Sequence, residues 1–353
     1  MNNKALIDKL ARERSLTTQE YEVLLSAYTQ KEADYLARLA RNAREKVYGN
    51  RVFFRGLIEI SNICKNDCYY CGIRASNKRC ERYRLSDEEI LSCCREGYAL
   101  GFRTFVLQGG EDGYFADEVL QRLLKEIKGE FPHCAITLSL GERSEESYAR
   151  LKAAGADRYL LRHETIDAEH YRELHPNAMS HKRRLECLQA LRRCGYQVGC
   201  GFMVGSPGQS TQILARELKF FEEFKPDMCG IGPFIPHTDT PFGQKEAGSA
   251  ELTAVLISCL RLIHPTVLLP ATTALASLET EGRIRGLLAG ANVVMPNLSP
   301  QEVRHKYTLY NNKKSSGSES AEQLAALQSN LETIGMTLFV GRGDREEENN
   351  GKV

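Results

Sequence analysis

The chain has 353 residues, 42% of them hydrophobic, and carries 47 Lys and Arg against 46 Asp and Glu. A net charge near zero argues against nucleic acid as a partner, because such proteins usually carry a basic surface. No apolar stretch reaches the roughly 18 residues that a membrane span needs, and residues 1–5 begin no signal-peptide apolar region. Because the 12 cysteines come without a secretion signal, we expect a cytoplasmic protein without a membrane partner.

The first 50 residues form a predicted helical cap, which is polar and carries the capping box Thr17-x-x-Glu20. From 51 to 312, short apolar runs alternate with amphipathic helical patterns. Strands are predicted at 57–61, 103–108, 135–140, 158–163, 197–203, 228–232, 267–271 and 292–295. Helices are predicted at 86–100, 116–129, 145–154, 180–194, 210–224, 249–263 and 278–289.

This alternation predicts an α/β fold of parallel βα units, and eight units suit a (β/α)8 TIM-type barrel. An open doubly wound sheet is the alternative. Residues 313–353 form a predicted short C-terminal extension, with a helix near 320–334, a strand near 337–340 and a charged tail from Asp344 that we expect to be disordered. We interpret the whole chain as one structural domain.

Three cysteines follow the first predicted strand with the spacing Cys64-x3-Cys68-x2-Cys71. Three thiolates can bind three irons of a 4Fe-4S cluster and leave the fourth iron open to another ligand. A structural zinc site is the alternative, but it requires four ligands, and Cys80 stands too far along the chain for such spacing. An aromatic residue, Tyr70, directly precedes the last cysteine of the motif.

Polar residues also gather at the ends of the next strands, where (β/α)8 barrels place their active sites. The second strand ends in Gln108 and a Gly-Gly-Glu turn at 109–111, whose glycines permit close approach of the backbone to a ligand. On the third strand, Thr137 and Ser139 share one face. The fourth ends in the charged run 162–164, which is costly to bury unless it is paired or faces a cavity. A structural ion pair is the alternative interpretation of that run.

The cysteine spacing and the Gly-Gly-Glu turn one βα unit later resemble the radical S-adenosylmethionine (SAM) superfamily. More specific runs resemble its HydE family of FeFe-hydrogenase maturases, in order from about residue 50 to 312. These runs are Arg162-His163-Glu164-Thr165, Met203-Val204-Gly205-Ser206-Pro207-Gly208-Gln209, Gly232-Pro233-Phe234-Ile235-Pro236-His237 and Met295-Pro296-Asn297.

The resemblance implies one 4Fe-4S cluster whose open iron binds SAM, and reductive cleavage of SAM to a 5′-deoxyadenosyl radical. It also implies an electron donor, a small iron–carbonyl–cyanide–cysteine substrate made by the maturase HydG, and delivery towards the maturase HydF. Some relatives carry a second cluster near the C-terminus. We expect none here, because the last cysteine is Cys259.

The motif and the resemblance together predict the following sites. The predicted cluster ligands are Cys64, Cys68 and Cys71. The predicted cofactor-binding residues are Tyr70, Gln108, Gly109, Gly110, Glu111, Thr137, Ser139, Glu164, Arg184, Met203 and Tyr307. The predicted catalytic residues are Arg162 and Tyr310, and the predicted substrate-cavity residues are Met228 and Met295. Rival functions are 3-methylornithine synthase, biotin synthase and, from another class, a non-enzymatic iron–sulfur carrier.

Overall fold

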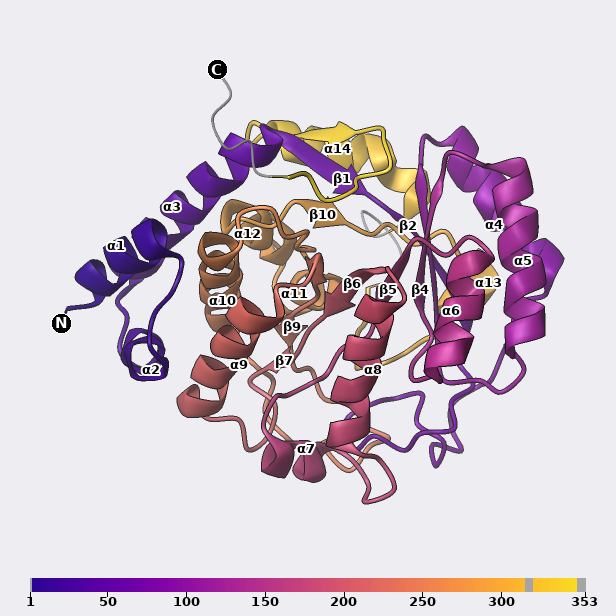
Figure 1. Ribbon diagram of the computed structural model, residues 1–353, viewed down its shortest axis with the longest axis horizontal. Helices are drawn as coiled ribbons and strands as arrows, with labels where there is room; N and C mark the ends of the chain where they lie inside the picture. Colours follow the sequence, from indigo (N-terminus) through magenta and orange to yellow (C-terminus); the bar gives the residue numbers. More distant parts are fainter. Residues whose placement is uncertain (1, 315–319, 348–353) are drawn as a thin grey trace.

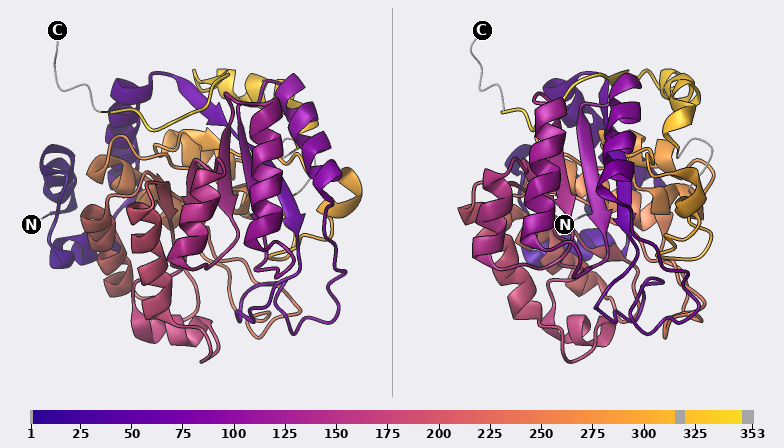
Figure 2. Two further views of the ribbon diagram at one scale, coloured as in Figure 1. Left: turned by 45° about the vertical axis from the view of Figure 1, so that its right-hand side comes forward. Right: turned by 90° about the vertical axis from the view of Figure 1, so that its right-hand side faces the viewer.

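Parallel strands form a ring that helices surround in a computed structural model, which describes residues 2–314 and 320–347 (Figures 1 and 2). The largest sheet has the order β2-β3-β4-β5-β6-β8. Its strands are β2 (Gly56–Ser61), β3 (Thr104–Gly109), β4 (Ala135–Ser139), β5 (Arg158–Leu160), β6 (Gln197–Cys200) and β8 (Met228–Cys229). Two short strands, β7 (Met203–Val204) and β9 (Gly232–Pro233), pair separately beyond β6 and β8.

The ring closes through an extended segment at 267–271 and through β10 (Val293–Val294). Leu268 bridges Met228 of β8, and Pro270 bridges Val293. Strand β10 pairs in parallel with β1 (Arg51–Phe54), and Asn297 bridges Leu57 of β2. Because only Arg55 separates β1 from β2, the two strands occupy one position of the ring. The predicted (β/α)8 barrel is therefore confirmed.

Amphipathic helices cover the outside of the barrel. They are α4 (Asp87–Ala99), α5 (Asp117–Glu130), α6 (Glu145–Ala153), α7 (Ala168–Leu174), α8 (His181–Arg193), α9 (Thr211–Phe224), α10 (Ala250–Ile263), α11 (Thr273–Leu278), α12 (Gly282–Leu288) and α13 (Gln301–Arg304). The sequence analysis missed α7 and predicted one helix at 278–289. That region contains α12, while α11, which precedes it, and α13 were also missed. A Cβ atom at Gly282 would lie 2.0 Å from the Leu275 carbonyl oxygen, so α11 and α12 meet closely there.

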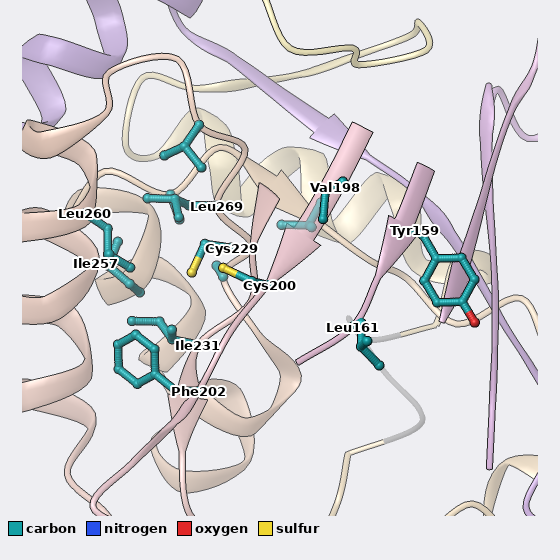
Figure 3. Packing of buried hydrophobic residues seen from close by; sticks show 14 of the residues in the cluster. Tyr159, Leu161, Val198, Cys200, Phe202, Cys229, Ile231, Ile257, Leu260 and Leu269 are labelled. Atoms are coloured by element: carbon teal, nitrogen blue, oxygen red, sulfur yellow. The ribbon is translucent and has the colours of Figure 1, made fainter. Parts of the chain in front are cut away.

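Apolar side chains fill the layer between the strands and the helices, because the hydrophobic effect drives such side chains out of water in a two-layer fold. Figure 3 shows the part of this layer between the strands and α10, where Cys200 and Cys229 on neighbouring strands face Ile257 and Leu260. All four side chains are at most 1% exposed. No described helix is both long and apolar enough to cross a membrane.

The N-terminal residues form α1 (Asn3–Glu13), α2 (Thr18–Ser26) and α3 (Gln30–Tyr48), which lie outside the barrel beside α9 and α10 (Figure 1). The expected capping box is present, because Thr17 accepts a hydrogen bond from the Glu20 amide and the Glu20 carboxylate accepts one from the Thr17 amide. Buried leucines on α1, α2 and α3 attach these helices to the barrel.

The C-terminal extension lies at the end of the barrel where β1 begins, opposite the loop that follows β2 (Figure 1). It contains η2 (Ala321–Gln323), α14 (Leu324–Glu332) and β11 (Thr337–Phe339), which pairs with β1. Disorder was expected from Asp344 onward; in the described part of that tail, 344–347, Asp344 forms ion pairs with Arg158 and Arg342. The rest of the predicted tail, 348–353, lies outside the described residues.

Candidate active site

A cavity of about 300 Å³ opens at the C-terminal ends of the barrel strands. This volume is within the range of small-molecule sites. Most residues predicted from the sequence line it, although they come from five strand ends, the first turn of α8 and the loop after β10. They are Cys64, Cys68, Tyr70, Cys71, Gln108, Gly109, Gly110, Glu111, Ser139, Arg162, Glu164, Arg184, Met203, Tyr307 and Tyr310.

The cysteine loop is held from both sides by backbone hydrogen bonds. The Lys65 amide donates to the Glu111 carbonyl oxygen at 3.1 Å, and the Gly72 amide donates to the Leu309 carbonyl oxygen at 2.9 Å. Gly110 packs directly under the loop, where an added Cβ would lie 2.3 Å from the Ile63 carbonyl oxygen. The second glycine of the Gly-Gly-Glu turn is therefore required, because a larger residue would collide with the cysteine loop.

Burial raises the pKa of all three cysteine thiols, that of Cys68 to about 12 and that of Cys71 well above its usual value. A buried thiolate needs a nearby positive charge, which an iron–sulfur centre supplies on binding. Among the described residues, no three His, Cys, Asp or Glu side chains are grouped around a single metal ion. In a 4Fe-4S cluster, each of the three thiolates would bind a different iron.

Two charged residues of the same cavity, Arg162 and Glu164, leave hydrogen-bonding capacity unused. Glu164 has a positive φ of 67°, a conformation that non-glycine residues rarely adopt outside functional sites. Its Oε2 lies 3.3 Å from Arg162 Nη2, yet both atoms are buried without a hydrogen-bond partner. Buried polar atoms in this state are costly, so they indicate a site for a polar ligand.

Arg184 joins this group from the first turn of α8. Its Nε donates to Glu142 Oε1 at 2.6 Å, and its Nη1 donates to the Arg162 carbonyl oxygen at 2.8 Å. Glu111 lines the cavity, but its carboxylate is already engaged, because its Oε1 accepts from the Glu142 amide at 3.1 Å and its Oε2 lies 3.2 Å from Lys65 Nζ. The Gly-Gly-Glu turn therefore presents backbone rather than a free carboxylate to the cavity.

Three predicted residues lie outside the cavity. Thr137 lies two register positions below Ser139 on β4, paired with Val106 rather than with Gln108, and its Oγ1 is buried without a hydrogen-bond partner. Met228 and Met295 belong to an apolar cluster deeper in the barrel. Met228 begins β8 and accepts a contact of 3.0 Å from Arg55 Nη1 on its sulfur. Depth along the strand separates these residues from the cavity.

The sequence analysis missed several cavity residues, of which Thr272 is the most informative. Its Oγ1 is buried without a hydrogen-bond partner, and the residue directly follows the extended segment 267–271. Its place at a strand end was the available signal, but a threonine there is too common to stand out. The other missed lining residues are Asn66, Ile73, Gly141, Leu160, Leu161, Gly232, Pro233, Phe234, Ile235, Ala274 and Leu309.

Residues 58–221 match the model of the Radical SAM superfamily. The chain belongs to this superfamily and is an enzyme, and the superfamily uses a 4Fe-4S cluster and SAM. Among individual proteins, it is 43% identical over 310 residues to the [FeFe] hydrogenase maturase subunit HydE of Thermotoga maritima, covering 88% of each chain. It is 31% identical to the 3-methylornithine synthase of Methanosarcina acetivorans, covering 81% of each.

Solved structures support the same fold. Methylornithine synthase (PylB) superposes with a TM-score of 0.83 at 29% identity, over 95% of this chain and 97% of that one. The maturase HydG of Carboxydothermus hydrogenoformans superposes with a TM-score of 0.77 at 22% identity, over 95% of this chain and 78% of that one. At that identity the likeness to HydG concerns the fold alone.

The cavity fits the cofactors of the superfamily on its own features. Three cysteine side chains line it together with Arg162, Glu164 and Thr272, whose polar atoms have unused hydrogen-bonding capacity. Gly109 and Gly110 bring backbone to the surface of the same cavity. The donor set thus offers soft ligands for iron beside polar ligands for a charged organic molecule.

Proposed function

We propose that this enzyme cleaves SAM reductively in the assembly of the two-iron subcluster of FeFe-hydrogenase, as a HydE-type maturase. The observation that carries the proposal is the 43% identity to HydE over 88% of both chains. The runs Arg162–Thr165, Met203–Gln209 and Gly232–His237 support it, because each contributes residues to the one cavity that the cysteines line.

A bound 4Fe-4S cluster with SAM would supply one-electron cleavage to methionine and a 5′-deoxyadenosyl radical. In this proposal Cys64, Cys68 and Cys71 hold one cluster and leave one iron open. Glu164 accepts hydrogen bonds from SAM, and Arg184, oriented by Glu142, attracts its carboxylate. Backbone carbonyl oxygens at the Gly-Gly-Glu turn accept from its ammonium group.

The substrate in this proposal is a small iron–carbonyl–cyanide–cysteine complex that HydG makes, and the product passes towards HydF in the cytoplasm. Arg162 and Tyr310 face the cavity and would contact substrate during the reaction. Tyr307 is 2% exposed and receives a hydrogen bond from Gln108 Nε2 at 3.4 Å, so the two residues form a wall that excludes water. An electron donor completes the set of partners.

The test has two stages under anaerobic conditions. Reconstituted protein with reductant and SAM should release methionine and 5′-deoxyadenosine, and substitution of Cys64, Cys68 or Cys71 by alanine should abolish the release. The protein should then activate FeFe-hydrogenase apoprotein in the presence of HydG and HydF. An iron-bearing protein that leaves SAM intact would be a cluster carrier, and one that cleaves SAM without supporting activation would not be a maturase.

A second candidate is 3-methylornithine synthase, which the TM-score of 0.83 over nearly the whole of both chains favours. The product 3-methylornithine is a constitutional isomer of lysine. Incubation of the reduced protein with lysine and SAM, followed by mass-spectrometric separation of the two isomers, distinguishes this activity. We expect no 3-methylornithine from this enzyme.

A further inference from the structure

The segment formed by α7 and the turn after it contacts the cysteine loop at three consecutive residues. The Tyr69 amide donates to the Leu174 carbonyl oxygen at 3.0 Å. The Tyr70 hydroxyl lies 3.1 Å from His175 Nε2, and the Cys68 and Met179 sulfur atoms are 3.8 Å apart. The loop that carries the cluster ligands therefore rests on this segment as well as on the barrel.

The hydrogen bonds of His175 determine its tautomer. Its Nδ1 lies 2.9 Å from the Tyr171 carbonyl oxygen, which can only accept, so Nδ1 carries the proton. Nε2 is then an acceptor, and the Tyr70 hydroxyl donates to it. His175 is 1% exposed, and burial lowers its pKa to about 3. The imidazole is therefore neutral at physiological pH and keeps this pattern.

Ring packing fixes the plane of the imidazole. The Tyr171 ring stacks on His175 with centroids 4.0 Å apart and an angle of 24°. The Tyr70 ring meets His175 edge-on, with centroids 5.4 Å apart and an angle of 86°. Because Tyr70 lines the cavity between two cluster cysteines, the orientation of its ring defines part of the surface that SAM meets.

We propose that His175 is a positioning residue for SAM binding, which acts by holding the Tyr70 ring in place through the tyrosine hydroxyl. The inference rests on the SAM-dependent reaction and assigns no chemical step to His175. If the Tyr70 ring is already held in place, SAM binding does not have to reduce the conformational entropy of that side chain.

The test measures SAM affinity directly, by anaerobic equilibrium dialysis of the cluster-loaded protein. We expect His175→Phe, which removes the acceptor, to weaken SAM binding about tenfold, the effect of roughly one lost buried hydrogen bond. Tyr70→Phe should weaken it by a similar factor, and the double variant should be no worse than either single one. His175→Gln retains a side-chain acceptor and should recover most of the affinity.

The matched control is Tyr196→Phe, which removes a buried hydroxyl that donates to the Tyr148 carbonyl oxygen at 2.8 Å, away from the cavity. It should leave SAM affinity unchanged. Unaltered SAM affinity in Tyr70→Phe would overturn the inference. So would a loss in the control as large as in the two single variants, or a loss in the double variant equal to the sum of the two single losses. If His175→Phe fails to retain its cluster, Tyr70→Phe and His175→Gln carry the test.

Failure of the inference is separable from failure of the proposed function. The affinity measurement needs only the cluster and SAM, whereas the proposed function needs the hydrogenase activation assay. Electron paramagnetic resonance provides a second readout, because the change that SAM causes in the spectrum of the reduced cluster should be smaller in His175→Phe than in Tyr196→Phe. Equal changes in these two variants would contradict a positioning role.

Discussion

Glu164 combines an unfavourable backbone conformation with a buried carboxylate oxygen that has no hydrogen-bond partner. Its amide donates to the Gly201 carbonyl oxygen at 3.0 Å, and its carbonyl oxygen accepts from the Met203 amide at 3.3 Å, so both neighbours hold the residue in place. Backbone strain of this kind persists where the surroundings enforce it and commonly marks functional sites.

Replacement Glu164→Gly should separate function from stability. Glycine adopts positive φ without strain, which offsets its larger loss of chain entropy, so we expect the free energy of unfolding to change by less than about 1 kcal/mol. SAM affinity should fall about 10- to 100-fold, as expected for loss of hydrogen bonds to a charged group. Urea unfolding and equilibrium dialysis provide the two measurements.

The control for this variant is Lys225→Gly, at another residue with positive φ, 47°, which follows α9 and does not line the cavity. This variant should leave SAM affinity unchanged. If Glu164→Gly bound SAM normally but unfolded easily, the carboxylate would have a structural role instead.

At the scale of elements, the segment after β11 runs across the end of the barrel where β1 begins. It supplies hydrogen-bond and ion-pair partners for the buried arginines there. Arg158 on β5 is 0% exposed, and its Nη2 donates to the Arg342 carbonyl oxygen at 2.9 Å and to Asp344. Arg55, between β1 and β2, donates to the Gly343 carbonyl oxygen at 3.2 Å. This end of the barrel therefore depends on residues more than 180 positions later in the chain.

Substitution Asp344→Asn should destabilise the protein by about 2–4 kcal/mol, because it leaves the buried Arg158 charge without a carboxylate. Glu346→Gln is the matched control. Glu346 pairs with Arg51 at 2.7 Å on the surface, where both side chains are at least 30% exposed, and its loss should cost under about 1 kcal/mol. Equal effects of the two variants on urea unfolding would contradict this role for the tail.

The Asp344 contact should also depend on pH. Burial opposes ionisation, but hydrogen bonds from Arg342 and the charge of Arg158 outweigh it and lower the pKa of Asp344 to about 2. Because the folded pKa lies below that of the unfolded chain, the stabilisation is complete above about pH 4. It is lost as pH falls towards 2. The difference in unfolding free energy between wild type and Asp344→Asn should therefore shrink as pH falls from about 4 to about 2.

At the scale of the molecule, the positions of the cysteines predict one cluster per chain. Outside the cavity, Cys93, Cys94, Cys134, Cys187, Cys200, Cys229 and Cys259 are buried, and Cys80 and Cys194 are half-buried. Anaerobic reconstitution should give about four irons per chain, and Cys80→Ala should retain them. About eight irons would reveal a second cluster, and a spectrum insensitive to SAM would favour the iron–sulfur carrier.

The barrel was predictable because each βα unit repeats a local pattern that packing reinforces. The capping box at Thr17 was predictable for the same local reason and is present, and Ser86 forms another at the start of α4. The pairing of β1 with β10 and β11 was not predicted, since it joins the start of the barrel to segments from the far end of the chain. Pattern analysis found the features that depend on residues close together in the sequence. It missed contacts between distant segments, however strong these contacts are.

The sequence by itself determined the cluster motif, the alternation of strands and helices and most residues of the cavity, because a cysteine spacing or a strand end is a local property. Only the tertiary structure decided that the Glu111 carboxylate is already bound by neighbouring residues, that Met228 and Met295 lie below the cavity, and that Thr272 lines it. It also placed His175 behind Tyr70. Depth in a barrel and contact between distant segments arise when the ring closes, and no local pattern encodes that step.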